Sequence, residues 1–329
     1  MRKVLIGLIG AAVLAIAPAK AQNYNLTLAG ASPGGLWSTI GAGFDKSLAK
    51  AYPGSTVTYQ TGPGGLANAK LVQDRKVPMG IIGDPELAAA VNGTGPFKGR
   101  PQKDIRVLFR AYSPSARFQY QYVLVNGDVA KKYGIKTLAD LKKQAGNIRI
   151  VFNRPGNMDG DISIAIAEAH GISLKSFKQV VRAASREQVS LMLDRRVDAQ
   201  IYGIAYNHPR IRETANGIPL AMLDVGQAVS AKLAKDFGGK VCVIKANEHK
   251  FISADKTSVC LGAIIGAHKD MDEKTAYNIV KGVIKNIDDF KNAHRLLKKV
   301  TTLKSLAEPS AVALHHPGAI KAFKEAGLM

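Results

Sequence analysis

The chain has 329 residues, a hydrophobic fraction of 46% and a formal net charge of +21. Its length exceeds a typical single domain of about 100–200 residues, so we expect two folded units with ample core. A strong positive charge is one mark of nucleic-acid binding. Here the basic residues are dispersed among acidic ones, without a long Lys/Arg block or basic-aromatic alternation, which indicates a solvated basic surface and no nucleic-acid partner.

The N-terminus has the pattern of an export signal. Arg2 and Lys3 precede an almost continuous apolar run from Val4 to Ala17, and Ala19-Lys20-Ala21 has the small residues of a signal-peptidase site. We therefore expect residues 1–21 to be a signal peptide, cleaved after Ala21, and a mature periplasmic protein with a formal charge of +18. A retained anchor is the alternative, but a spanning helix needs about 20 apolar residues and this run is shorter.

Strands and helices alternate in the first part of the mature chain. Periodicity predicts strands at residues 26–29, 56–60, 79–83 and 105–111. Helices are expected after Gly30–Gly35, where Ile40, Phe44 and Leu48 share a face, at residues 66–74, and after Asp84 as N-cap with Pro85 at the first helical position.

A second, similar series follows. Strands are predicted at residues 120–125, 148–152 and 198–202, and capping boxes at Thr137-x-x-Asp140 and Ser185-x-x-Gln188 are expected to open helices. The C-terminal part reads as mostly helical, with one apolar stretch at residues 259–267. Such alternation predicts an α/β fold with two lobes, joined by crossings near residues 117–122 and 257–262 and enclosing a ligand cleft.

Three glycine-rich turns each lead into a predicted helix. They span residues 30–37, 61–68 and 153–161. Helix N-termini bind anions, and turns after parallel strands are the usual ligand sites of such sheets. The candidate ligand-binding residues lie in and beside these turns: Ser32, Gly34, Gly35, Leu36, Trp37, Gly64, Gly65, Leu66, Asn68, Asp84, Asn153, Arg154, Gly156, Asn157, Tyr202 and Gly203.

Several of these candidates have equally simple structural interpretations. Trp37 either stacks on a ligand or packs against the protein, and Asp84 is a helix cap first and a ligand contact second. Arg154 is the candidate charged partner of a carboxylate, although a solvated arginine fits the sequence as well.

Catalytic and metal motifs have little support. Gly30-Ala-Ser-Pro-Gly34 matches the G-x-S-x-G elbow of serine hydrolases, but Pro33 has no N–H to donate to an oxyanion. No spacing of cysteine or histidine indicates a metal site, and we expect no cofactor and no enzymatic activity. Cys242 and Cys260 permit one disulfide in an exported chain; two buried free thiols are the alternative.

Together these motifs resemble the solute receptors of TRAP transporters of the TAXI type (TRAP-associated extracytoplasmic immunogenic proteins). The matching segments, in chain order, are Gly30–Gly41, Thr61–Asn68, Gly83-Asp84, Val197–Ala199 and Leu314–Ile320 with Gly327-Leu328. The chain departs from the family at Trp37, at Asn153–Asn157 and at Val77–Met79, near the expected cleft.

The resemblance implies a type II periplasmic-binding-protein fold and delivery of an organic acid to a membrane permease. The ligand would be a dicarboxylate, an oxo-acid or an acidic amino acid, bound by a monomer. We expect residues 22–118 and 260–329 to form one lobe and residues 119–259 the other. A sensor protein for a signalling receptor and a hydrolase remain the alternative functions.

Overall fold

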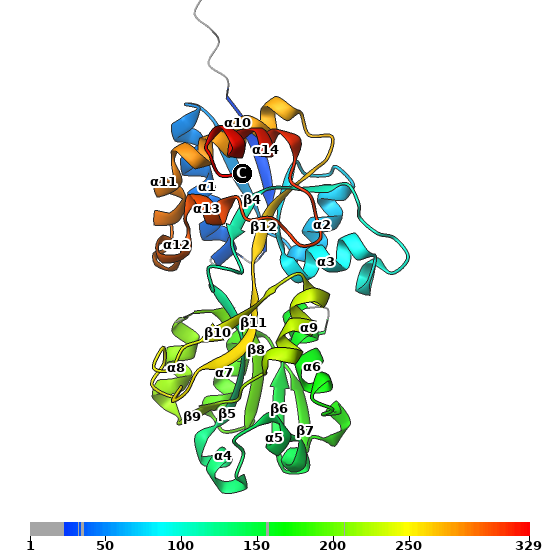
Figure 1. Ribbon diagram of the computed structural model, residues 1–329, viewed down its shortest axis with the longest axis vertical. Helices are drawn as coiled ribbons and strands as arrows, with labels where there is room; N and C mark the ends of the chain where they lie inside the picture. The colour runs from blue at the N-terminus through cyan, green and yellow to red at the C-terminus, as the bar shows by residue number, and fades with distance from the viewer. Residues whose placement is uncertain (1–22, 32, 34–35, 156–157, 207) are drawn as a thin grey trace, which may run out of the picture.

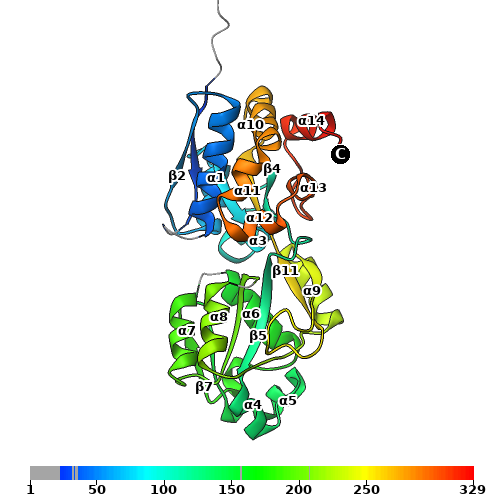
Figure 2. The same ribbon diagram turned by 90° about the vertical axis from the view of Figure 1, so that its left-hand side faces the viewer.

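The computed structural model describes residues 23–31, 33, 36–155, 158–206 and 208–329. These residues form two α/β lobes stacked along the long axis of the molecule, each around its own sheet (Figures 1 and 2). We call the lobe that contains both ends of the described chain the first lobe, and the other the second lobe. The strands are β1 (Asn25–Ala29), β2 (Thr56–Gln60), β3 (Met79–Gly83), β4 (Ile105–Tyr112), β5 (Gln119–Asn126), β6 (Arg149–Phe152), β7 (Gln179–Arg182), β8 (Ala199–Ala205), β9 (Leu220–Met222), β10 (Lys240–Ile244), β11 (Lys256–Leu261) and β12 (Ala263–His268).

Helices cover the faces of both sheets, as the alternating pattern predicts. Those of the first lobe are α1 (Leu36–Ala51), α2 (Gly65–Gln73), α3 (Asp84–Asn92), α10 (Glu273–Lys285), α11 (Ile287–Asn292), α12 (Arg295–Val300), α13 (Leu303–Leu306) and α14 (Pro317–Glu325). Those of the second lobe are α4 (Gly127–Tyr133), α5 (Leu138–Gln144), α6 (Met158–Ala169), α7 (Ser185–Leu193), α8 (Pro209–Gly217) and α9 (Gln227–Phe237).

Among the described residues, the first lobe has a five-stranded sheet in the order β2-β1-β3-β12-β4. β1, β2 and β3 are parallel, and β12 is antiparallel to both of its neighbours. Because β1 lies between β2 and β3, the strand order reverses beside β1, and such a switch point opens a crevice at the carboxyl ends of the strands. The turn that follows β1 therefore starts at a position suited to a ligand.

The second lobe repeats this plan with a mixed sheet. Within the described residues it has seven strands in the order β10-β11-β5-β8-β6-β7, and β9 pairs with β5. β6 is parallel to β7 and β8, whereas β5 is antiparallel to β8. The core of each lobe is apolar and closely packed: Phe44, Phe109 and Phe290 meet edge to face in the first lobe, and Ile150, Ile162 and Ile201 are fully buried in the second.

The chain passes between the lobes twice, after β4 and after β11. The first crossing uses residues 113–118, and the second uses Gly262, the single residue between β11 and β12. A side chain at Gly262 would lie 2.6 Å from Pro114 Cδ and 2.7 Å from the Tyr112 carbonyl oxygen, so only glycine lets the two crossings run side by side. This double crossover confirms the predicted fold class, a type II periplasmic-binding-protein fold; the lobe boundaries at residues 118/119 and 259/260 stay a prediction.

Asp84 and Arg110 tie this hinge together. Both side chains are 1% exposed and form an ion pair, while the other Asp84 carboxylate oxygen accepts the Gly262 N–H at 2.7 Å. Arg110 also donates to the backbone carbonyl oxygens of Glu308 and Pro309, at 3.1 and 2.8 Å. Asp84 is the first residue of α3 and Gly83 its N-cap, so the cap expected at Asp84 is placed one residue too late.

Four other features named in the sequence analysis can be compared with the structure. Thr137 and Asp140 form the predicted capping box of α5. Ser185 does not cap α7, because the helix begins at Ser185 itself and Gln188 donates to the Ala183 carbonyl oxygen instead. The apolar stretch at residues 259–267, to which the sequence assigned no element, contains the end of β11 and most of β12. Cys242 of β10 and Cys260 of β11 lie on neighbouring strands, two register positions apart, and form a disulfide with a Cα–Cα distance of 5.7 Å.

Candidate functional site

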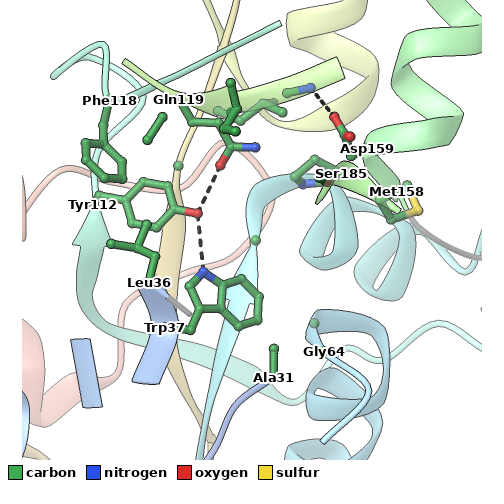
Figure 3. A pocket seen from close by; sticks show the side chains of 18 of the residues that line it. Ala31, Leu36, Trp37, Gly64, Tyr112, Phe118, Gln119, Met158, Asp159 and Ser185 are labelled. Carbon is green, nitrogen blue, oxygen red and sulfur yellow. Dashed lines mark hydrogen bonds between the residues drawn. The ribbon is translucent and has the colours of Figure 1, made fainter. Parts of the chain in front are cut away.

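A cavity of about 630 Å³ lies between the two lobes. Residues from the first turns of helices in both lobes line it (Figure 3). Its walls, as far as the structure describes them, consist of Ala31, Leu36, Trp37, Thr39, Pro63, Gly64, Gly65, Leu66, Gly83, Pro85, Glu86, Tyr112, Phe118, Gln119, Asn153, Met158, Asp159, Ile162, Ser185, Gly203, Ile204, Ala205, His208, Pro209, Arg210, Leu261, Gly262, His294 and Leu296. This volume is within the range of about 300–1,000 Å³ found for small-molecule sites.

Six helices of nine or more residues bring their N-termini to this cavity, counted among the described residues. They are α1, α2 and α3 from the first lobe and α6, α7 and α8 from the second. Each such terminus carries about half a positive charge. In α3 and α8 the N–H groups of Asp84 and Arg210 are already bonded, to the Gly262 carbonyl oxygen and to His208 Nδ1, so the free N–H groups belong to the other helices. The fold therefore concentrates positive potential in the cleft without requiring any basic side chain.

The turn after β1 is shaped by Tyr59. Its hydroxyl accepts the Ala31 N–H at 2.7 Å, and a Cβ atom at Gly30 would lie 2.1 Å from its ring. Gly30 is therefore needed for packing, and the Ala31 N–H is already used within the protein. On this side of the cavity, the residues placed to contact a ligand are therefore those in and beside α1 and α2, where Trp37, Gly64 and Leu66 line the cavity.

A hydrogen-bonded chain of three side chains lies on one wall and links the lobes (Figure 3). Trp37 Nε1 donates to the Tyr112 hydroxyl at 3.4 Å, which in turn donates to Gln119 Oε1 at 3.1 Å. Trp37 belongs to α1 and Gln119 to β5, so this series of hydrogen bonds connects the first lobe to the second. Trp37 is the only tryptophan in the sequence, and it is placed where a ligand or a change of lobe angle alters its surroundings.

The ionisable side chains of the described wall, apart from Tyr112, are those of Glu86, Asp159, Arg210 and two histidines. Burial, assisted by Arg210, lowers the pKa of His208 to about 4, and burial also lowers that of His294. Both imidazoles are thus neutral near pH 7. Burial raises the pKa of Glu86 to about 7 and that of Asp159 to about 6.

Asp159 is integrated into the second lobe. Its carboxylate accepts hydrogen bonds from Asn153 Nδ2 at 3.0 Å, from Gln121 Nε2 at 3.3 Å and from the Gly203 N–H. These bonds join the ends of β6 and β8 to the start of α6. Asp159 and Asn153 therefore shape the cavity wall as well as face it.

The structure brings together about half of the ligand contacts expected from the sequence. Leu36, Trp37, Gly64, Gly65, Leu66, Asn153 and Gly203 line the cavity. Ser32, Gly34, Gly35, Gly156 and Asn157 lie outside the described residues.

Four expected contacts do not reach the described wall. Asn68 is buried and donates to the Ile81 carbonyl oxygen at 2.7 Å, and Asp84 is paired with Arg110 at the hinge. Tyr202 is fully buried beside Tyr122 in the core, and Arg154 is exposed. Arg210 is the arginine that faces the cavity, and neither it nor Glu86, Asp159, Tyr112 and Gln119 was among the candidates. Glu86 and Asp159 carried one signal, since each is an acidic residue in the first turn of a helix that follows a glycine-containing turn.

No group of three or more histidine, cysteine, aspartate or glutamate residues that could hold a metal ion occurs in the described part of the chain. A search of the same residues for a helix long and apolar enough to span a membrane also finds none.

Several solved structures have the same fold. PhnD1 from Prochlorococcus marinus, in complex with methylphosphonate, matches with a TM-score of 0.52 and 12% identity over 93% of this chain and 99% of its own. MatC from Rhodopseudomonas palustris, with bound malate, has a TM-score of 0.52 and 13% identity over 83% and 88%. A TctC solute binding protein from Polaromonas has a TM-score of 0.52 and 12% identity over 93% and 96%.

At these identities the similarity establishes the architecture. The sequence itself adds the family, because residues 28–327, almost the whole chain after the expected signal peptide, match the NMT1-like family. The protein therefore belongs to the NMT1-like family.

Proposed function

We propose that this protein is a periplasmic solute-binding protein, which captures a small organic anion between its lobes and delivers it to a membrane permease. The observation that carries this proposal is the convergence of six helix N-termini on one cavity between two hinged lobes. Fixed backbone donors need no ordering when the ligand arrives, which favours tight binding of a small anion.

Arg210 is the side chain that we propose as the charged ligand contact. It is the one arginine on the described wall, where lysine is absent, and it lies in the first turn of α8. Its partial burial strengthens a hydrogen bond to a carboxylate relative to one in water. The surface charge of +18 on the mature chain would further raise the local concentration of anions, an effect that salt weakens.

The relatives support the same chemistry. Two of the structures with this fold hold methylphosphonate and malate, both anions, and the third is named a solute binding protein. The motif series from Gly30 to Leu328 leads us to propose the TAXI type within this class, and hence a TRAP permease as partner. The expected signal peptide at residues 1–21 supports export to the periplasm.

The test is to identify the ligand directly. Protein purified from its native periplasm is denatured, and the released small molecules are identified by mass spectrometry. The compound is then titrated back by calorimetry and by the fluorescence of Trp37. We expect an organic anion that binds with one-to-one stoichiometry; a folded protein that releases no small molecule and binds no member of a panel of organic acids contradicts the proposal.

Two arginine variants test the placement of the site. Arg210→Ala should weaken binding roughly tenfold or more, because a charged hydrogen bond contributes about 1.5–3 kcal/mol. Arg154→Ala, which removes an exposed guanidinium, should bind like the parent. The reverse result would move the anion site to the turn at Asn153–Asn157 and would refute the role of Arg210.

A further inference from the structure

Glu86 is a carboxyl group without a partner on the wall of the cavity. Among the described residues, no cation lies within ion-pair distance of it, and no side chain or backbone of another residue donates to it. Its one hydrogen bond is to its own backbone N–H. By contrast, the buried Asp84 two residues earlier has Arg110 and Gly262 as partners, and Asp159 on the opposite wall accepts three hydrogen bonds.

Two glycines leave the space that the Glu86 side chain occupies, because neither carries a side chain of its own. A Cβ atom at Gly65 would lie 2.8 Å from Glu86 Cγ, and one at Gly83 would lie 2.2 Å from Glu86 Oε2. Both glycines line the cavity as well. The side chain is therefore seated between the first turns of α2 and α3, and any side chain at these two positions would displace it from there.

An unpaired carboxyl group on the cavity wall disfavours the binding of a purely anionic ligand. Glu86 belongs to the first lobe and Asp159 to the second, and their like charges oppose each other across the cleft. Closing the lobes on an anion would bring its charge beside Glu86 and Asp159 in a water-poor space, which costs electrostatic energy unless these carboxyl groups take up protons. A positively charged or N–H donor group between them removes that cost and provides the hydrogen bond that Glu86 lacks.

We infer that Glu86 selects ligands that carry an ammonium or other N–H donor in addition to their acidic group, and that this donor binds between the lobes. The inference rests on the proposed function and restricts its ligand class: amino-substituted organic acids are favoured over dicarboxylates and oxo-acids of the same length. The acidic end of the ligand then faces the helix N-termini and Arg210, and the donor end faces Glu86.

The experiment compares ligand pairs that differ only in one amino group. L-aspartate with succinate and L-glutamate with glutarate are titrated by calorimetry into the parent protein. We expect the amino member of at least one pair to bind about tenfold to a hundredfold more tightly, the range of a charge-assisted hydrogen bond. Equal binding, or tighter binding of the unsubstituted acid, overturns the inference and leaves the proposed function standing.

Variants of Glu86 show whether this residue causes the preference. Glu86→Gln keeps the shape of the side chain but removes its charge, so the two members of a pair should bind within about threefold of each other. The matched control is Glu187→Gln, which changes an exposed glutamate at the same position in the first turn of α7 and should retain the parent's preference. A Glu86→Gln protein that still prefers the amino member refutes the assignment of Glu86.

If neither pair of ligands binds, the identity of the native ligand tests the inference. A released compound with an ammonium or N–H donor supports it, whereas an organic anion without one overturns it while the solute-binding function stands. If the folded protein neither releases a ligand nor binds any probe, the proposed function itself fails, and the inference fails with it.

Discussion

The buried pair of Asp84 and Arg110 is the most consequential polar contact in the hinge. Replacing Asp84 with asparagine leaves the guanidinium buried without a counter-charge, a change that typically costs 3–5 kcal/mol. We expect the lower end, about 3 kcal/mol, because the carbonyl oxygens of Glu308 and Pro309 still accept from Arg110 and the asparagine oxygen can still accept the Gly262 N–H. Whole domains are stable by only about 5–15 kcal/mol, so the loss is readily measured.

Urea unfolding followed by Trp37 fluorescence and by far-ultraviolet circular dichroism measures this loss in ligand-free protein. Coincidence of the two transitions is required before a free energy is assigned, because two lobes can unfold separately. Asp74→Asn is the control: it removes the exposed partner of Lys70 and should cost at most about 0.5 kcal/mol.

A double variant separates lost charge pairing from lost shape. Asp84→Asn combined with Arg110→Met removes the stranded charge, so it should be more stable than Asp84→Asn alone. If Asp84→Asn stays within about 1 kcal/mol of the parent, the pair does not hold the hinge and the reasoning is refuted.

Two further predictions concern the disulfide and the cleft carboxyl groups. Denatured, unreduced protein should contain no free thiol, and replacing both Cys242 and Cys260 with serine should lower stability by about 3 kcal/mol, the entropy of opening a loop of this length; two titratable thiols would contradict the bridge. Because the folded-state pKa of Glu86, about 7, is raised above its ordinary value of 4.5, the folded state binds the proton more tightly and this residue lowers stability progressively as the pH rises from about 4.5 to 7. The stability of ligand-free Glu86→Gln relative to the parent should therefore increase over that range in parallel unfolding curves, and a pH-independent difference would show that Glu86 is not buried.

The local sequence pattern was sufficient to predict most of the helices and strands. The strands at Thr56–Gln60 and Met79–Gly83 have the predicted bounds because glycine and proline turns stop them on both sides. The run at residues 259–267 was left unassigned because a continuous apolar segment has no period that distinguishes helix from strand. It is apolar throughout because it crosses the centre of both lobes, and Gly262, where the sheets change, is the one sign of the break.

The site was predictable at the level of turns but not of side chains. Turns that follow parallel strands gather at one edge of a sheet, which is why Trp37, Gly64 and Asn153, named from their turns, all line the cavity. Which neighbouring polar group faces the cavity depends on how the two lobes are set against each other. Asp84 and Glu86 are two residues apart on one helical turn, yet one is buried in the hinge and the other faces the cleft.

The hinge and the cavity share residues, so the angle between the lobes and ligand binding depend on each other. The first turn of α3 holds Gly262 at one crossing through Asp84 and faces the cavity through Glu86. At the other crossing, Tyr112 and Gln119, the last and first residues of β4 and β5, form the wall and the link to Trp37. A rotation of the lobes about these crossings must change the distance between cavity groups of the two lobes, so a ligand that contacts both favours one lobe angle in proportion to its differential contacts. Lobe closure and ligand recognition are therefore one equilibrium in this fold, and the fluorescence of Trp37 reports it.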